Sequence, residues 1–183
     1  MNSKRQPFGC RFFYGKKYLR PMQNQKVYTV EEVQKKLEHY CAYQERCHQE
    51  VIQKLRQFKM IPSAIDRIIG YLIEHNYLNE TRFAKSFARG KFRIKKWGKE
   101  RLLRELKQRN ISSYNIRLAL KEIPEDDYLK TIEELATKFW LSNASRQKQI
   151  QKKKVFDALR YRGWESELVY REIKRLEDTS LSI

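Results

Sequence analysis

The sequence predicts an all-α protein made of three tandem helical units. Only 6 Gly and 4 Pro occur among 183 residues, and the alternation of apolar and polar residues that is typical of strands is scarce. One ungapped apolar pattern also fits the chain three times, centred on Leu55, Leu106 and Leu159, which are 51 and 53 residues apart. A period of this length indicates an array of supersecondary units. Three ordinary helix pairs could share part of the pattern by chance, and we prefer the repeat.

The pattern describes a helical hairpin with a buried face. Apolar residues lie four and three positions before the central leucine and five, ten and fourteen positions after it. In the middle unit these residues are Leu102, Leu103, Ile111, Ile116 and Leu120. The position four after the leucine holds Lys59, Asn110 or Gly163. Asn and Gly favour the left-handed conformation that ends a helix, so a turn is expected there.

The first unit, residues 27–78, is expected to hold three helices. Thr29 and Glu32 form a capping box that starts the first of them. Pro62 starts the third, because proline is tolerated in the first turn of a helix. The expected helices span about residues 29–45, 48–58 and 62–75.

The second and third units, residues 79–123 and 124–177, are expected to hold three helices each. Asn79 caps the first helix of the second unit, and Ser112 or Ser113 caps its last. Acidic residues follow Pro124, where they interact favourably with a helix dipole. The expected helices span about residues 80–94, two within 97–120, 124–140 and two within 146–176. Residues 178–183 are assigned to a frayed C-terminal tail.

Residues 1–26 are predicted to form a flexible basic arm. Phe, Tyr, Lys and Arg alternate there without a sustained period, and Gly and Pro interrupt the segment. Interleaved rings and cations suit single-stranded nucleic acid, where rings stack on bases and cations follow phosphates. They suit docking on the helical body of the protein equally well, and both interpretations stay open.

The net charge of +18 at pH 7 is concentrated in three segments. Residues 1–26 hold seven basic and no acidic side chains, residues 85–107 hold ten and two, and residues 146–162 hold seven and one. Such a distribution predicts a polyanion or an acidic protein surface as partner. The alternative is a solvated surface that only keeps the protein in solution.

Two basic surfaces are predicted from this distribution, each expected to contact a partner protein or nucleic acid. In the central surface, spacings of three residues keep Arg101, Arg104 and Lys107 on one side of their helix, away from its leucines. The central surface comprises Arg89, Lys91, Arg93, Lys95, Lys96, Lys99, Arg101, Arg104 and Lys107. The second comprises Lys152, Lys153, Lys154, Arg160 and Arg162. Trp97 and Trp164, at helix junctions, are expected in the core more than at a contact.

No constellation in the sequence supports catalysis. The histidines His39, His48 and His75 lie in no metal-binding arrangement, and the acids after Pro124 are explained by the helix start. A glycine-rich phosphate loop and a nucleophile elbow are both absent from the sequence. We therefore expect no enzyme, no cofactor and no metal.

The cysteines and the hydropathy pattern predict a cytoplasmic protein. Cys10, Cys41 and Cys47 form no disulfide framework, so reduced thiols are expected. No apolar run approaches the ~20 residues that span a bilayer, and no signal peptide is evident. We expect a soluble, cytoplasmic protein without membrane contact. Nothing resembles a long coiled-coil seam, and a monomer is expected.

Three motifs in order resemble the RecX regulatory proteins, bacterial modulators of the RecA recombinase. Residues 77–84, YLNETRFA, are similar to the family's Tyr-Leu-(Asn/Asp)-acid-x-x-aromatic-Ala junction. Residues 98–111 resemble its central hairpin, and residues 159–164 resemble the Leu-x-x-Arg-Gly-aromatic motif of its third unit. In the hairpin the matching residues are Gly98, Arg101, Leu102, Glu105 and Leu106. The resemblance covers roughly residues 28–177.

The chain departs from the family pattern at four positions. Asn76 and Asn110 stand where Gly is usual, Glu80 where Asp is usual, and Lys59 replaces the Gly of the first unit. Asn accepts a left-handed conformation at modest cost, so these changes put helix boundaries in doubt more than the fold.

The resemblance implies three tandem three-helix repeats that form an elongated, curved array. It also implies a non-enzymatic regulator that binds RecA and its filament on DNA, limits filament extension and so restrains ATP turnover and strand exchange. Contact with single- or double-stranded DNA would run through the basic surfaces. The alternative is a helical nucleic-acid-binding protein that acts independently of RecA. The arm at 1–26 has no clear counterpart in the family pattern and could strengthen DNA contact.

Overall fold

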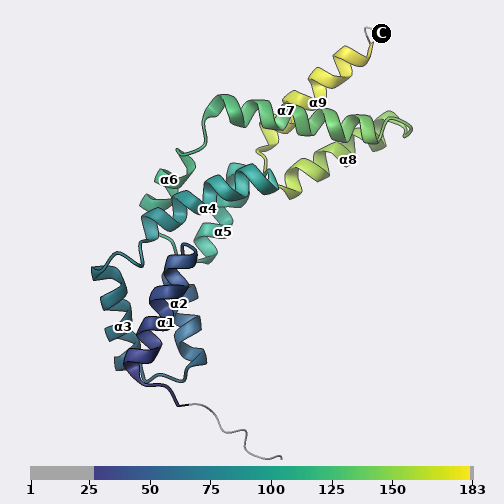
Figure 1. Cartoon of the computed structure of the whole chain (residues 1–183). Helices are drawn as coiled ribbons and strands as arrows, with labels where there is room; N and C mark the ends of the chain where they lie inside the picture. The colour runs from purple at the N-terminus through teal and green to yellow at the C-terminus, as the bar shows by residue number, and fades with distance from the viewer. Residues whose placement is uncertain (1–26, 182–183) are drawn as a thin grey trace, which may run out of the picture.

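The computed structural model describes residues 27–181, which form nine α-helices and no strand. The predicted arm, residues 1–26, lies outside the described residues. Figure 1 shows an elongated, curved body in which three groups of three helices follow one another. The helices are α1 (Val30–Tyr43), α2 (His48–Gln57), α3 (Pro62–Glu74), α4 (Glu80–Lys95), α5 (Lys99–Gln108), α6 (Ser113–Leu120), α7 (Glu125–Ser142), α8 (Lys148–Tyr161) and α9 (Ser166–Leu181). The prediction of an all-α array of three three-helix units is confirmed.

Local capping signals start the helices where the sequence placed them. The Glu32 amide donates to Thr29 Oγ1 at 3.2 Å and the Thr29 amide to Glu32 Oε2 at 3.0 Å, which completes the capping box. Asn79 Oδ1 accepts from the Arg82 amide at 3.0 Å. Of the two serines considered for α6, Ser112 is the cap, since its hydroxyl accepts from the Asn115 amide. These side chains satisfy amides that a helix start leaves without partners.

Left-handed residues end helices at equivalent positions of the three units. Lys59, Asn110 and Gly163 have φ of 55°, 58° and 80° in the turns α2–α3, α5–α6 and α8–α9. Lys59 therefore adopts the left-handed conformation that glycine favours. Asn76 after α3 and Lys96 after α4 are also left-handed, at 57° and 54°. The helix ends are thus kept despite the departures from the family pattern.

The buried side chains divide into two clusters. One lies within α1–α3 and the residues that follow them, with Leu37, Leu55 and Ile68 fully buried. The other runs through α4–α9 without interruption, and Trp164 and Tyr128 are its largest fully buried side chains. Units of about 50 residues bury little apolar area alone, and sharing a core compensates for this. The second and third units share one hydrophobic core, and the first unit has a separate core.

The structure differs from the prediction mainly at helix ends. α9 continues to Leu181 through residues that were assigned to the tail, and α7 continues to Ser142, two residues beyond the expected end. Helix ends are the least predictable feature of a sequence, because end turns depend on tertiary contacts. The unit boundaries after residues 78 and 123 stay predictions. Among the described residues, no helix is long and apolar enough to span a membrane.

Candidate partner and nucleic-acid interface

Two glycines hold the second and third units in backbone contact. The Gly98 amide, at the start of α5, donates to the Arg162 carbonyl at 2.9 Å, and the Glu100 amide donates to the Gly163 carbonyl at 3.2 Å. A Cβ on Gly98 would lie 2.2 Å from the Gly163 oxygen, and a Cβ on Gly163 would lie 2.3 Å from the Cβ of Arg101. Only glycine permits so close an approach. The α4–α5 turn and the α8–α9 turn therefore form one rigid platform.

Buried aromatic side chains complete this platform. The Trp164 indole Nε1 donates to the Lys96 carbonyl at 3.2 Å, and its ring lies 4.4 Å from that of Tyr128. The Tyr128 hydroxyl donates to Glu165 at 2.5 Å and accepts from the Lys99 amide at 2.8 Å. Burial, followed by the hydrogen bond to Glu165, raises the pKa of Tyr128 above its ordinary value of 10.0. The tyrosine stays neutral at neutral pH, and it links α7 to the start of α5 and to Glu165, the residue before α9.

The platform brings together basic residues that are far apart in the sequence. Arg160 pairs with Glu100 at 2.8 Å and donates to the Trp164 carbonyl at 2.6 Å. Arg101 donates from Nη1 to the Tyr161 carbonyl at 3.0 Å. Arg162 donates to the Ala158 carbonyl and lies over the Phe139 ring. The last two members of the predicted second surface thus belong beside the central one.

A ladder of alternating cations and rings crosses this region. The Arg109 guanidinium lies 4.9 Å from the Phe87 ring, and Lys91 Nζ lies 5.4 Å from both Phe87 and Trp97. Arg101 follows, 4.2 Å from the Trp97 ring and 5.0 Å from that of Tyr161. Cation–π contacts of this kind hold long side chains in fixed positions. Trp164 lies in the core, as expected. Trp97 is half-buried, and Lys91 and Arg101 both lie over its ring.

Several of the predicted residues are held by ion pairs or by the backbone. Arg89 pairs with Glu122 at 3.1 Å, and Lys99 pairs with Glu125 at 2.6 Å. A hydrogen bond from Lys85 and the charges of Lys85 and Arg89 lower the pKa of the half-buried Glu122 carboxyl. Lys152 pairs with Glu177, near the far end of the third unit. Lys96 contributes its left-handed backbone and its carbonyl.

The side chains of six exposed residues among those predicted form no hydrogen bond, ion pair or cation–π contact with the described part of the chain. Their ammonium and guanidinium groups are available to an anionic partner, because no internal acid neutralises them. In the centre they are Arg93, Lys95, Arg104 and Lys107, and on α8 they are Lys153 and Lys154, all exposed.

The sequence reasoning missed three members of the ladder, namely Phe87, Tyr161 and Arg109. Tyr161 is 72% exposed at the end of α8 and would be overlooked by any search for buried residues. Its neighbours Arg160 and Arg162 were selected for their charge, so the alternation of ring and cation was the available signal. Arg109 lies at the end of α5, outside the three-residue spacing that selected Arg101, Arg104 and Lys107.

Within the described residues, no group of three or more His, Cys, Asp or Glu side chains could hold a metal ion. Cys41 and Cys47 are free and buried. Burial raises the pKa of Cys41 to about 11, and it also raises that of Cys47. Thiols with such pKa values are poor nucleophiles at neutral pH.

Comparisons with known proteins converge on one family. The model of the second three-helix domain of RecX matches residues 79–120. The regulatory protein RecX of Vibrio campbellii is 33% identical over 115 residues, 63% of this chain and 72% of that protein. The regulatory protein RecX of Lactobacillus gasseri is 30% identical over 142 residues, 75% of this chain and 51% of that protein. The chain thus spans about half the length of the Lactobacillus gasseri relative.

A solved structure supports the same fold. The crystal structure of RecX from Lactobacillus salivarius superposes with a TM-score of 0.71 at 21% identity. The superposition covers 81% of this chain and 96% of the Lactobacillus salivarius chain. At this identity the likeness supports the helical array and says nothing of individual contacts.

Proposed function

Because the chain belongs to the RecX family of regulatory proteins, we propose that it is a non-enzymatic regulator of the RecA recombinase. It binds RecA and RecA–DNA filaments, limits filament extension and so inhibits ATP hydrolysis and strand exchange. It acts as a cytoplasmic monomer and contacts DNA through its basic surfaces.

One observation supports this function above the others, namely the platform between the second and third units. There the backbone contact of Gly98 with Gly163 holds cations of both units in a fixed arrangement. A filament presents the same chemical groups at regular intervals along its length. A rigid array of cations binds such a ligand without the entropy cost of ordering each side chain separately.

Charge reversal of the exposed residues Arg104 and Lys107 is the most direct test of the predicted surface. Arg101 is a poor choice for charge reversal alone, since it also donates to the Tyr161 carbonyl of the third unit. The triple reversal of Arg101, Arg104 and Lys107 to Glu is therefore compared with the double variant R104E/K107E. Lys35 and Arg67, both exposed in the first unit, provide a control, K35E/R67E, with the same change of charge as the double variant. Filament binding should fall in the first two variants and persist in the control.

The function itself is tested by RecA ATP hydrolysis on single-stranded DNA, titrated with this protein while DNA is in excess. Substoichiometric inhibition supports action on the filament. Inhibition that appears only once the DNA is coated supports the second candidate, a nucleic-acid-binding protein independent of RecA. That candidate is favoured by the exposed cations, and it predicts steeply salt-dependent DNA binding. No effect at any ratio contradicts the proposal.

A further inference from the structure

A groove of about 280 Å³ lies where the first and second units meet. One wall is formed by Gln44 and Glu45, which follow α1, and the other is a stripe along α4. The stripe comprises Phe83, Ser86, Phe87, Gly90, Lys91, Ile94 and Lys95. These positions follow the spacing of a single helix face. The stripe extends about 18 Å along the helix, given a rise of ~1.5 Å per residue.

The floor of the groove is apolar and lacks a side chain at its middle. Phe83 is buried and Phe87 is half-buried, while Ile94 at one end is 77% exposed. A Cβ on Gly90 would meet nothing within 4 Å, so no internal contact requires glycine there. Glycine inside a helix costs about 1 kcal/mol relative to alanine. A ligand that packs closely against the α4 backbone at Gly90 would account for a glycine at this position.

The charges around the groove favour an acidic occupant. Lys95 is exposed and forms no ion pair with the described residues, and Lys91 Nζ is held over the Phe87 and Trp97 rings. The acid of the opposite wall, Glu45, is already paired with Arg82 at 2.5 Å. The other carboxylate oxygen, Glu45 Oε2, is buried without a hydrogen-bond partner, and neither Lys91 nor Lys95 pairs with Glu45 or with another described acid. An anion from outside the described residues can therefore pair with the two lysines.

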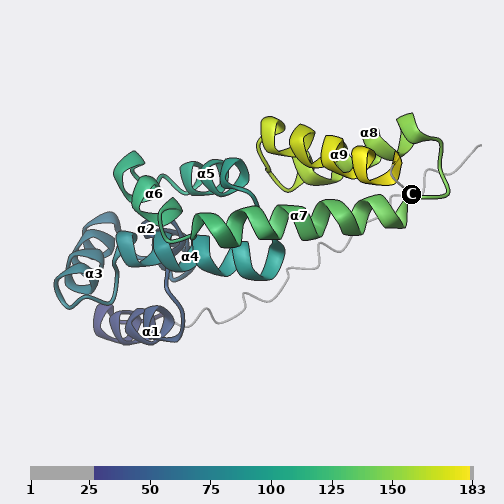
Figure 2. The same ribbon diagram turned by 90° about the horizontal axis from the view of Figure 1, so that it is seen from above.

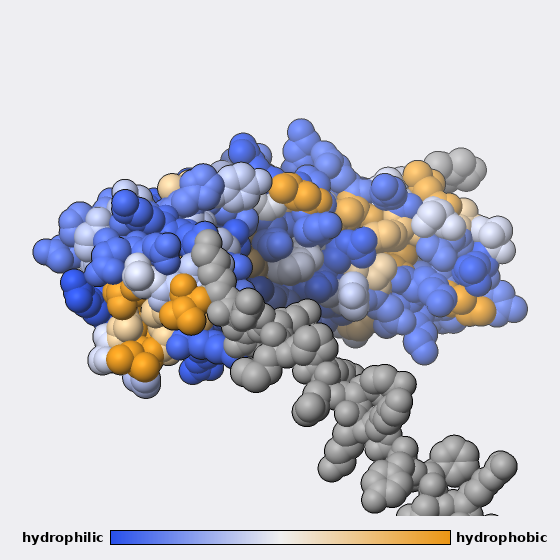
Figure 3. Space-filling view, turned by 60° about the horizontal axis from the view of Figure 1, so that its bottom comes forward, coloured by the Kyte–Doolittle hydropathy of each residue, from blue (hydrophilic) through white to orange (hydrophobic). Residues whose placement is uncertain are grey.

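We propose that this groove binds an amphipathic helical segment of a partner protein, with a stripe of apolar side chains flanked by carboxylates. The apolar stripe packs on Phe83, Phe87 and Ile94 and approaches closely at Gly90, while carboxylates pair with Lys91 and Lys95. A nucleobase is a poorer match, because Lys91 and Arg109 both lie against the Phe87 ring and Ile94 offers no ring to stack on. Figure 3 shows that the face turned towards the viewer is mostly hydrophilic, with smaller hydrophobic areas.

Occupation of the groove would also join the two units. The segment would contact Gln44 and Glu45 of the first unit and α4 of the second at the same time. A bound segment would therefore fix the angle between units that are otherwise joined by few contacts.

The test is fluorescence polarisation with a labelled helical peptide of about four turns that carries Leu along one face and Glu on both flanks. The full chain is compared with Gly90→Leu, which fills the groove, and with Gly70→Leu as matched control. Gly70 also lies inside a helix with nothing within 4 Å of its Cβ, but on α3 and outside the groove. Circular dichroism checks that both variants fold.

We expect Gly90→Leu to weaken peptide binding at least about ten-fold and Gly70→Leu to change it by less than about two-fold. A peptide with Gln in place of Glu should bind about ten-fold more weakly, and Lys95→Glu should weaken binding of the Glu peptide. Equal affinities of the two glycine variants would overturn the proposal, as would equal binding of the Glu and Gln peptides. Gly90-dependent binding of oligothymidylate, or Gly90-dependent dimerisation of the chain, would assign the groove to another occupant and overturn it too. The assay contains no recombinase, so its outcome is independent of the regulatory function.

Discussion

The two junctions between the units differ in kind. Between the second and third units, backbone hydrogen bonds, glycine contacts and the buried pair of Tyr128 and Trp164 form a continuous core. Between the first and second, the contacts are mainly polar: Arg82 donates to Glu45 and Asn76, and His48 Nδ1 lies 2.6 Å from Glu80 Oε1. Of the first unit, only Cys47 is buried in the core of α4–α9. Figure 2 shows α1–α3 set to one end of the body that α4–α9 form.

This difference suggests a division of roles along the chain. A core excludes water and accepts few arrangements, because close-packed side chains resist deformation. Partly exposed ion pairs contribute little stability and can be exchanged for water. The third unit should thus keep its orientation to the second, whereas the first unit can turn. The groove proposed above lies at the junction that can move.

The largest effect should come from adding a methyl group at the rigid junction. Gly163→Ala places a side chain at φ 80° and 2.3 Å from the Cβ of Arg101. We expect the free energy of unfolding of α4–α9 to fall by about 2–4 kcal/mol, from strain and overpacking together. Urea unfolding followed by circular dichroism measures the change. A loss under about 0.5 kcal/mol would show that the contact between the turns is looser than described.

A smaller loss is expected from Tyr128→Phe. It removes the donor to Glu165 and the acceptor for the Lys99 amide, which should cost about 1–3 kcal/mol in the free energy of unfolding. The pH dependence gives an independent check. The pKa of Tyr128 is raised in the folded state, so the unfolded chain loses this proton first as pH rises above 10.0. Stability should fall above that pH in the wild type, and less steeply in Tyr128→Phe; equal slopes would contradict the assignment.

Features governed by local chemistry were predictable from the sequence. The Thr29 capping box, the Asn79 cap and the left-handed Asn110 depend on residues within one turn, and all three are present. The contact of Gly98 with Gly163 was not predictable, because it joins positions in two different units. Taken separately, each glycine predicts only an ordinary turn. For the same reason Arg160 and Arg162 were assigned to a separate surface. The basic residues proposed for the site, apart from Arg109, could be listed from the sequence, but their grouping is a tertiary property.

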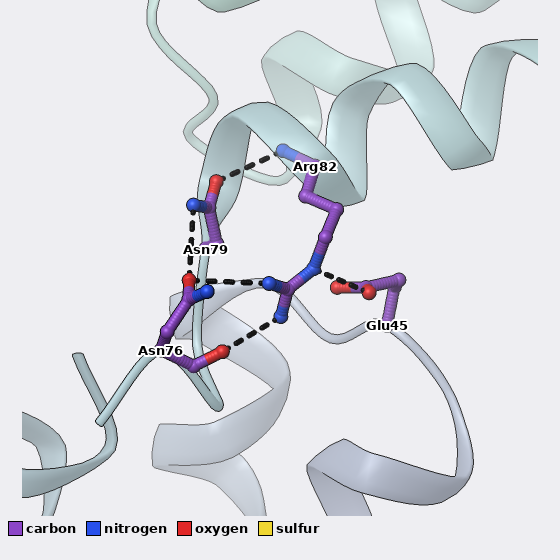
Figure 4. Close-up of polar contacts among 4 residues, drawn as sticks. All are labelled: Glu45, Asn76, Asn79 and Arg82. Atoms are coloured by element: carbon purple, nitrogen blue, oxygen red, sulfur yellow. Dashed lines mark hydrogen bonds and ion pairs between the residues drawn. The ribbon is translucent and has the colours of Figure 1, made fainter. Parts of the chain in front are cut away.

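The polar junction should respond differently to the loss of its central contact. Figure 4 shows Arg82 between Glu45 and Asn76, with Nε 2.5 Å from Glu45 Oε1 and Nη2 2.9 Å from the Asn76 carbonyl. Because Arg82 and Glu45 are partly exposed, Arg82→Gln should lower stability by only about 1 kcal/mol. Its main effect should be a broader range of angles between the first and second units.

Small-angle X-ray scattering measures that range through the radius of gyration and the width of the distance distribution. Arg67→Gln, an exposed change on α3, is the control and should leave both unchanged. If Arg82→Gln scatters like the wild type, then the junction is held by contacts other than this arginine.

The smallest change expected is a gain of stability in the first unit. Gly70 lies inside α3 with nothing within 4 Å of its Cβ, so Gly70→Ala should stabilise that helix by about 0.5–1 kcal/mol. Because the first unit has its own core, this gain should appear only in the unfolding of α1–α3, while Gly163→Ala affects only α4–α9. Hydrogen exchange resolved along the chain separates the two. Were Gly70→Ala to slow exchange equally in α8 and α9, all three units would unfold together, and the polar junction would transmit stability as well as the packed one does.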